Sequence, residues 1–401
     1  MPRPMNARQE LGLLLVLMLV MFTCIADFMI MMPLASYLMA ELKISTAQFG
    51  LLVSAYSLAA GASSLLASSQ ADRFDRRHSL LGCYAGLIVA TLACGLATDF
   101  HWLLLARVLA GIFGGVLGSI CMAIVGDVIP PERRGQAMSW VMLGFSLSAV
   151  AGVPLGLWLA AHAGWRLPFY ALAGICVVVL LAALVWVPPV RAHLARLDPN
   201  ANWLDNYREL LADTNHWWAV GLTAMLMVSG FLVIPFIAPT MIANSGIAQS
   251  ELMFVYLVGG AGTIFSRPLI GRLSDRYPKR HVVAALIVLS FLPIVLVTQS
   301  FHAPLGWHLA ISLLFFVFVS GRFIPATALV TGATRPHLRG RLMAFNSAVQ
   351  NFASGCASLL AGLIITQQPN GYLAHYGWVG LLSCLAGLVG IWIAARIKAV
   401  S

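Results

Sequence analysis

Two short polar stretches decide the fold of this chain: residues 71–77 read ADRFDRR, and residues 274–280 read SDRYPKR. The aspartate and the basic residues of the first stretch recur 203 positions later in the second. Three ordered matches at nearly the same spacing predict that one unit is duplicated along the chain. The other two matches are PPERRGQAMS at 130–139 with RPHLRGRLMA at 335–344, and HAGW at 162–165 with HYGW at 375–378.

The composition around these stretches is that of a membrane protein. Of the 401 residues, 60% are hydrophobic and 9% are charged. A soluble globular chain has about 45–50% apolar and about 25% charged residues, so this chain has too few charges to cover a water-facing surface. The composition excludes a cytosolic enzyme, a disordered protein and a secreted disulfide scaffold.

Twelve apolar runs are each long enough to cross the bilayer as a helix, which takes about 20 residues. We therefore expect an all-α membrane protein with twelve transmembrane helices, arranged as two pseudo-symmetric six-helix bundles because of the repeat. The runs lie near 11–39, 46–69, 79–98, 102–127, 137–161, 167–188, 217–244, 252–271, 282–299, 305–330, 342–366 and 376–396.

The loops between these runs differ in charge. Nearly all Lys and Arg residues of the loops fall on one side, whereas the other side has only Lys43 and Arg166. Positive loops stay in the cytoplasm, so both termini are predicted to be cytoplasmic in a multi-pass protein of a bacterial inner membrane. Arg3 and Arg8 precede a run that is too long for a signal peptide, so we expect an uncleaved first helix.

The longest polar stretch, from Pro188 to about Asn215, separates the two sets of six helices. It divides the chain into an N-terminal bundle at 1–188, a cytoplasmic linker at 189–215 and a C-terminal bundle at 216–401. Four linker residues on one helical face predict a short amphipathic helix, either on the membrane surface or packed on the bundle. These residues are Trp203, Tyr207, Leu210 and Leu211.

Several kinds of site are excluded because their patterns are missing. The net charge of +10 comes from short loops, and no basic face carries interleaved aromatic residues, so nucleic-acid binding is not expected. No GxxxxGK[ST] loop for a nucleotide occurs, and no His, Cys or Asp cluster has the spacing of a metal site. The seven cysteines lie inside apolar runs, as buried hydrophobes do. We expect neither an enzyme nor a cofactor.

The polar loop after the second helix of each half follows the pattern G-x-x-x-D-R-x-G-R-R/K. The second copy matches at Gly271, Asp275, Arg276, Lys279 and Arg280, with Pro278 in place of the second glycine. The first copy keeps Asp72, Arg73, Arg76 and Arg77, with Ser68 and Asp75 at the glycine positions. On these residues the chain resembles the major facilitator superfamily over nearly its whole length.

Two further motifs narrow the resemblance. Arg107 and Gly111 form R-x-x-x-G in the fourth helix, which is similar to the family's second motif. GVPLG at 152–156 resembles a reduced form of the antiporter motif of the proton-coupled drug and sugar efflux branch, with Leu157 and Trp158 at its final pair. The resemblance implies a monomeric secondary transporter that works by alternating access, with its cavity between the two bundles.

Ionisable residues in the hydrocarbon core are costly and mark functional sites. From helix lengths, Asp27 lies roughly 24 Å into a core of about 30 Å, and Arg107 lies roughly 8 Å below the outer surface. An isolated carboxylate at this depth would take up a proton, whereas a nearby guanidinium would keep it charged. We therefore predict that Asp27 and Arg107 approach each other and act in proton coupling; the alternative is a static pair that fixes helix packing.

Arg322 in the tenth helix is the third such residue, placed past the midplane. It is expected either to contact an anionic or polyhydroxylated substrate or to brace the C-terminal half through Gln350. Asn346 lies on the same helix as Gln350, near the same depth.

The remaining candidates are assigned to a cytoplasmic gate and to a substrate cavity. In the family the polar loops hold the inner gate shut; the alternative for the arginines is that they only set topology. The gate candidates are Asp72, Arg73, Arg76, Asp127, Arg134, Asp275 and Arg276, with Asp127 expected to bind Arg133 or Arg134. The cavity candidates are Thr23, Cys24, Met31, Tyr56, Phe231, Phe236, Tyr256, Arg322, Asn346 and Gln350.

These expectations combine into proton-coupled export of a small organic molecule across the bilayer. One alternative is proton symport or facilitated uptake of a small metabolite on the same fold. A second is a non-transporting membrane receptor or assembly partner, for which the loops offer no binding domain. Sugars, drugs, amino-acid-like metabolites and lipids are all compatible with the sequence.

Overall fold

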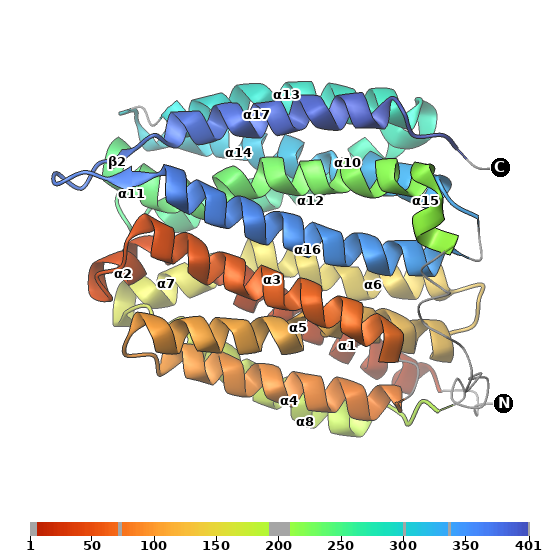
Figure 1. Cartoon of the computed structure of the whole chain (residues 1–401). Coiled ribbons are helices and arrows are strands. Elements are labelled where there is room, and N and C mark those ends of the chain that lie inside the picture. The colour runs from red at the N-terminus through yellow and green to blue at the C-terminus, as the bar shows by residue number, and fades with distance from the viewer. Residues whose placement is uncertain (1–5, 71–73, 192–208, 300–301, 336–337, 400–401) are drawn as a thin grey trace.

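The computed structural model describes residues 6–70, 74–191, 209–299, 302–335 and 338–399. Twelve of its helices are long and apolar enough to cross a membrane, which confirms the predicted fold class. They pack lengthwise into one bundle, in which α1 begins and α17 ends at the same end (Figure 1).

The first six spans come from the N-terminal half of the chain. They are α1 (Ala7–Ile30), α3 (Thr46–Gln70), α4 (Arg76–Gly95), α5 (Phe100–Val128), the run of α6 (Arg134–Leu147), η2 (Ser148–Gly152) and α7 (Val153–Ala163), and α8 (Leu167–Trp186). A short helix, α2 (Ala35–Glu41), joins α1 to α3. The five-residue η2 is a π-helical turn, a feature that often marks functional positions in helices.

The second six spans follow the same plan. They are the run of α10 (Thr214–Val233), η4 (Ile234–Phe236) and α11 (Ile237–Ser245), then α12 (Leu252–Arg276), α13 (Lys279–Gln299), the pair α14 (Leu305–Gly321) and α15 (Phe323–Gly332), α16 (Arg339–Ile364) and α17 (Tyr376–Ala394). Between the last two helices, β1 (Thr366–Gln367) and β2 (Leu373–Ala374) form an antiparallel hairpin.

The first transmembrane helix is shorter than the sequence predicts. The run predicted near 11–39 is wrong as a single helix, because α1 ends at Ile30, a turn containing Pro33 follows, and α2 is separate. Proline has no backbone N–H to donate, which favours such a break.

In the predicted linker, Trp203 and Tyr207 lie outside the described residues. Leu210 is buried in a small cluster of the C-terminal half.

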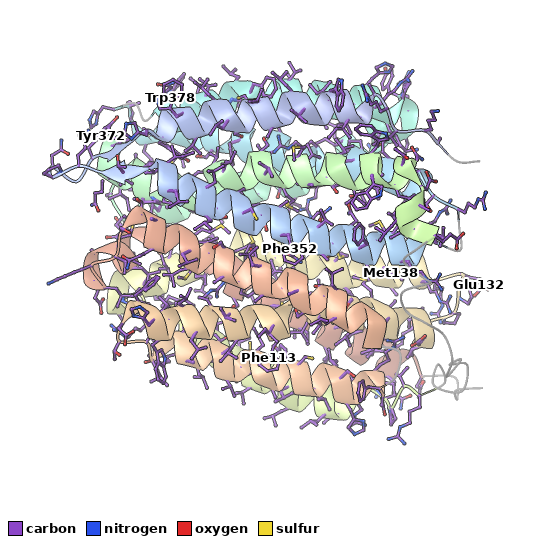
Figure 2. All side chains as sticks on the ribbon, viewed as in Figure 1. Phe113, Glu132, Met138, Phe352, Tyr372 and Trp378 are labelled. Atoms are coloured by element: carbon purple, nitrogen blue, oxygen red, sulfur yellow. The ribbon has the colours of Figure 1, made fainter. Side chains whose placement is uncertain are left out.

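The two ends of the bundle differ. We call the end where α1 begins and α17 ends the terminal face, and the end that carries β1 and β2 the hairpin face (Figure 1). Figure 2 shows Glu132 at the terminal face, and Tyr372 and Trp378 at the hairpin face. Trp378 is 64% exposed, as is common for tryptophan at a membrane–water boundary.

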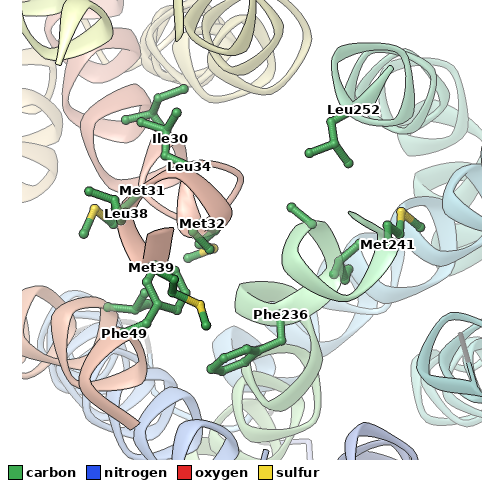
Figure 3. Packing of buried hydrophobic residues seen from close by; sticks show 14 of the residues in the cluster. Ile30, Met31, Met32, Leu34, Leu38, Met39, Phe49, Phe236, Met241 and Leu252 are labelled. Atoms are coloured by element: carbon green, nitrogen blue, oxygen red, sulfur yellow. The ribbon is translucent and has the colours of Figure 1, made fainter. Parts of the chain in front are cut away.

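The hairpin face is closed by an apolar cluster that both halves share. Figure 3 shows Met32, Met39 and Phe49 of the first half around Phe236 of the second. The rings of Phe49 and Phe236 are 5.7 Å apart between centroids and meet edge to face. The hydroxyl of Thr46 also donates across the halves to the carbonyl of Ile365 at 2.5 Å. Apolar burial therefore joins the halves at this face.

Further from the hairpin face, each half has its own apolar core. One cluster lies wholly within α1, α3–α6, α8 and the segments next to them. Two others lie wholly within the C-terminal half. Among the described residues, the apolar cluster to which both halves contribute is the one at the hairpin face, and elsewhere the halves meet along helix seams such as that of α3 with α16.

A polar contact fixes the hairpin to its own half. The side-chain amide of Asn244, at the end of α11, donates to the carbonyl of Leu373 and accepts from the N–H of Leu373, each at 2.8 Å. The side chain of Asn244 therefore pairs with β2 as a neighbouring strand would.

Small residues let α3 and α16 approach closely along the seam between the halves. A Cβ added to Gly50 would lie 2.8 Å from the carbonyl oxygen of Ser358 and 3.0 Å from the Cα of Gly362. These are backbone atoms, which side-chain rotation cannot move aside. Close backbone approach through small residues is the usual way in which helices associate in a bilayer.

We predict opposite effects for two glycine-to-alanine variants. Gly50→Ala should destabilise the protein by about 1–3 kcal/mol because it forces α3 and α16 apart. Gly82→Ala is the matched control, since no atom lies within 4 Å of its added Cβ and alanine favours the helix by about 1 kcal/mol. Thermal unfolding in detergent measures both, and equal melting temperatures for the two variants would contradict this packing.

At the terminal face, Asp75 caps α4 and ties it to the segment after α8. Its carboxylate accepts from the N–H of Arg77 at 2.9 Å, the N–H of Val190 at 3.2 Å and Nε of Arg191 at 2.8 Å. Burial by itself would raise the pKa of Asp75, yet these hydrogen bonds and that from His78 lower it to about 2. The carboxylate therefore stays charged throughout the physiological pH range.

The Asp75→Ala variant should lose about 1 kcal/mol of stability through the lost cap alone. Because the folded protein holds the pKa below the ordinary 3.8, the contribution is complete above about pH 4 and is lost as the pH falls towards 2. The difference in melting temperature between wild type and variant should thus be constant from pH 5 to 8 and shrink below about pH 4. A difference that shrinks between pH 8 and 5 instead would contradict this assignment.

Candidate functional site

A buried ion pair lies inside the N-terminal half. Asp27 is on α1, three residues before the helix ends, and Arg107 is on α5. Nη1 of Arg107 donates to Oδ2 of Asp27 at 3.0 Å, and the two side chains are 1% exposed or less. The predicted approach of Asp27 and Arg107 is therefore confirmed, while its role in proton coupling stays a prediction.

The carboxylate of Asp27 also binds a third side chain. The hydroxyl of Thr91, on α4, donates to Oδ1 of Asp27 at 2.9 Å, so each carboxylate oxygen has its own donor. The sequence analysis missed Thr91, because a threonine in an apolar span is ordinary, and only its depth opposite Asp27 could have identified it. Arg107 and Thr91 together hold the carboxylate of Asp27 between α4 and α5.

The other face of the guanidinium rests on an aromatic ring. Arg107 lies 4.5 Å from the ring centroid of Tyr56, and Nη1 also donates to the backbone carbonyl of Asp27 at 3.2 Å. Its Nε and Nη2 have no acceptor among the described residues. If Asp27 took up a proton, Arg107 would keep its charge in a dry site with only these weaker contacts, so protonation would favour a rearrangement here.

The other predicted cavity residues of the N-terminal half face inward within it. The hydroxyl of Thr23 is 2.8 Å from that of Tyr84. Sγ of Cys24 donates to the carbonyl of Gly114 at 3.4 Å and is 3.9 Å from the hydroxyl of Tyr56. These contacts place Thr23 and Cys24 in a polar layer of the N-terminal bundle, next to the ion pair.

Aromatic residues connect this layer to the other half. The ring centroid of Phe28 lies 5.0 Å from that of Tyr56 and 5.8 Å from that of Phe231 on α10. Phe28 directly follows Asp27, so the ion pair is one residue away from the contact between the halves. The sequence analysis did not single out Phe28, although its position beside a buried acid was visible.

Arg322 lies at the junction between α14 and α15 and is fully buried. Its Nη2 donates to the carbonyl of Leu226 at 3.1 Å, and its Nη1 donates to Oγ of Ser290 at 3.3 Å. The predicted brace through Gln350 is wrong, because Arg322 is held by α10 and α13 instead. Its Nε has no acceptor among the described residues.

The other predicted cavity residues of the C-terminal half are spread along the bundle. Asn346 accepts a short hydrogen bond from Thr223 inside that half. Tyr256 packs against Phe316, with 5.8 Å between centroids. Phe236 lies in the apolar cluster of the hairpin face, and so does Met31 of the N-terminal half.

One intramembrane charge was missed. Arg267 on α12 donates from Nη1 to Oγ of Ser146 at 3.0 Å and lies 5.0 Å from the ring centroid of Phe145, both on α6. It therefore links the halves along a second seam. An arginine inside the predicted run 252–271 was the available signal.

The predicted gate residues only partly come together. Asp72 and Arg73 lie outside the described residues. Arg76 binds Asp127 through Nε at 3.3 Å. The partners predicted for Asp127 are bound elsewhere: Arg133 pairs with Glu10 at 3.1 Å, and Arg134 donates to a backbone carbonyl.

The second-half copy of the gate motif is exposed. Asp275 and Arg276 lie at the end of α12, and neither forms an ion pair within the described part of the chain. Arg276 instead lies 5.8 Å from the ring centroid of Tyr277. Among the described residues, no group of His, Cys, Asp and Glu side chains could hold a metal ion.

Comparisons with known proteins agree on one family. The model of the Major Facilitator Superfamily matches residues 17–234 and again residues 219–400. A chloramphenicol resistance protein of Streptomyces lividans is 27% identical over 362 residues, which cover 87% of this chain and 88% of the relative. A chloramphenicol efflux pump of Mycobacterium tuberculosis is 25% identical over 354 residues, covering 88% of this chain and 83% of the pump.

Solved structures show the same fold. The D-xylose–proton symporter matches with a TM-score of 0.78 at 14% identity, over 97% of this chain and 99% of its own. A bacterial homologue of the human lysosomal transporter Spinster matches with a TM-score of 0.76 at 19% identity, over 98% and 95%.

The buried pair yields a stability prediction. Asp27→Asn leaves the guanidinium of Arg107 buried without its counter-charge, which should cost about 3–5 kcal/mol. Adding Arg107→Met removes that charge, so the double variant should be more stable than Asp27→Asn alone. Thermal unfolding of both single variants and the double variant measures this coupling. Strictly additive effects would show that the two side chains do not interact energetically.

Proposed function

Because the chain belongs to the Major Facilitator Superfamily, we propose that it exports a small organic molecule in exchange for protons. It is a multi-pass secondary transporter and not an enzyme. We further propose that it works as a monomer built of bundles 1–188 and 216–401, joined by the linker 189–215.

The charge of the loops supports an orientation. The loops at the terminal face carry nearly all of the basic loop residues, and such loops remain in the cytoplasm. We place the terminal face, with both termini, in the cytoplasm of a bacterium, and the hairpin face in the periplasm. In this orientation the shared apolar cluster would seal the periplasmic side, and opening to the cytoplasm would require the bundles to part at the terminal face.

The relatives support export rather than uptake. Two of them are named for chloramphenicol resistance or chloramphenicol efflux, and they align over more than four fifths of this chain. Their names make chloramphenicol the first compound to test here. Uptake by symport remains the alternative on the same fold, and the direction of flux separates the two.

The Asp27–Arg107 pair is the observation that carries proton coupling. In the conformation described, Asp27 is buried and in contact with Arg107. A proton arriving from the periplasm, when that side is open, would neutralise Asp27 and release Arg107. A buried guanidinium without a counter-charge is unfavourable, so the protein would then convert to the opposite conformation, in which the proton leaves. Proton movement and gate movement would thereby be linked.

The other candidates have proposed roles around this pair. We propose that Arg76 and Asp127, with Asp72 and Arg73, latch the cytoplasmic gate together with Arg134, Asp275 and Arg276. Substrate would contact the side chains near the contact between the halves, among them Tyr56, Phe231 and Arg322. A receptor without transport is disfavoured by this arrangement, because the described loops are short.

Flux in proteoliposomes tests the proposal. Compounds that stabilise the purified protein, beginning with chloramphenicol, are loaded on one side under a pH gradient. The wild type should move them opposite to the proton flow. Asp27→Asn should abolish gradient-driven movement while leaving exchange of labelled for unlabelled compound, since binding does not need the proton.

Two controls make the result interpretable. Thr91→Val removes one donor to Asp27 and should only slow gradient-driven flux, because Arg107 still binds the carboxylate. Full gradient-driven flux in correctly folded Asp27→Asn would refute the coupling scheme. Movement in the same direction as the protons would replace export by symport, and a protein that binds no compound but forms stable complexes would be a receptor.

A further inference from the structure

The two halves place equivalent residues at equivalent points of their first helices. The shift of 203 positions between the polar loops also takes Phe28 to Phe231, and these two rings meet each other between the halves at 5.8 Å. The same shift takes the end of α1 at Ile30 to the end of α10 at Val233. The repeat therefore holds at this depth.

The residue equivalent to Asp27 is Gly230. In the first half, the carboxylate of Asp27 binds Arg107. In the second half a guanidinium is again present: a Cβ added to Gly230 would lie 3.8 Å from Nη2 of Arg322, with no atom nearer than 3.6 Å. The second half thus keeps the cation and has room for a Cβ beside it, in ordinary contact with its neighbours, but it lacks the acid.

Nothing else in the second half supplies that acid. After Asp213 the whole sequence contains only Glu251 and Asp275, which lie at the two ends of α12. Neither forms an ion pair with Arg322. A guanidinium has five N–H donors, and Arg322 uses two of them on the neutral oxygens of Leu226 and Ser290.

A buried cation in a bilayer is expected to have a counter-charge, since leaving it unpaired is strongly unfavourable. We propose that Arg322, when the protein opens next to Gly230, binds the carboxylate of a small amphipathic organic acid and pairs with it as Arg107 pairs with Asp27. This inference rests on the proposed transport function, and it assigns an organic acid as the class of molecule carried.

The surroundings favour an organic acid over an inorganic ion. Ile234 and Val319 are the other nearest neighbours of the position, each 3.6 Å from the added Cβ, and the adjoining residue is Phe231. Aliphatic and aromatic walls suit the body of an organic acid, and the guanidinium suits its carboxylate in a bidentate manner. A halide would leave the apolar walls without a partner.

The site is closed in this conformation. Arg322 is fully buried, and Phe231 rests on Phe28 of the other half. In this proposal an acid reaches Arg322 only in a conformation that differs from the one described, so its binding is coupled to a conformational change.

An internal carboxylate tests the site without a ligand. The Gly230→Asp variant should melt higher than Gly230→Asn, which has the same shape and no charge, because only the aspartate pairs with Arg322. In an Arg322→Gln background this difference should vanish. If Gly230→Asp melts at or below Gly230→Asn in the presence of Arg322, the space does not accept a carboxylate and the proposal fails.

The ligand arm uses acetate, benzoate and salicylate as their sodium salts, with sodium chloride at equal concentration as the reference. At least one organic acid should raise the melting temperature of the wild type by a few degrees in a saturable manner. Gly230→Ala, whose Cβ fits the space, should retain a shift, whereas Arg322→Gln and Gly230→Asp should lose it. Stabilisation by chloride alone, or by none of the acids, overturns the proposal.

The same measurement in Asp27→Asn separates this inference from the proposed function. Binding of the organic acid should persist there, because Arg322 is untouched. Retained, Arg322-dependent binding together with failed proton-driven export would reject only the proton coupling. Proton-driven export of a neutral compound that is indifferent to Arg322→Gln would reject only the organic acid.

Discussion

The constraint on which the rest of this molecule depends is that a charge within a lipid-embedded bundle has no water to stabilise it. Asp27 meets this constraint with two donors, Arg107 and Thr91, one for each carboxylate oxygen. The helices α1, α4 and α5 are therefore joined by polar contacts inside the bundle, in addition to the apolar contacts that pack them.

The two halves share the same helix arrangement but differ in the charged residues that they bury. Both halves break their first helix at the same point, and both hold a fully buried arginine near it. In the first half the buried arginine, Arg107, pairs with the carboxylate of Asp27. In the second half the buried arginine, Arg322, binds only neutral oxygens among the described residues. A transporter that binds a proton in one half and its cargo in the other would need this difference.

Much of the fold followed from hydropathy and the repeat, because a helix that crosses a bilayer leaves a long apolar run. The break after Ile30 did not, since one proline in such a run is compatible with a kink or a break. The Asp27–Arg107 contact was predictable because depth alone limits where a buried acid finds a cation. Thr91 and the true partners of Arg322 were not, because helix rotation decides which hydroxyl or carbonyl points inward. Asp127 was assigned to arginines that are nearby in sequence, whereas Arg76 binds it from the start of α4.

Asn244 has a mechanical consequence. Its two hydrogen bonds to Leu373 make the end of α11 and the hairpin a single rigid piece. Across the halves, the same region is held by the side-chain contacts of Phe49 with Phe236, by one hydroxyl from Thr46 and by the close approach of Gly50 to Gly362. A displacement of α11 therefore carries the hairpin with it, so the hairpin moves as part of the second half.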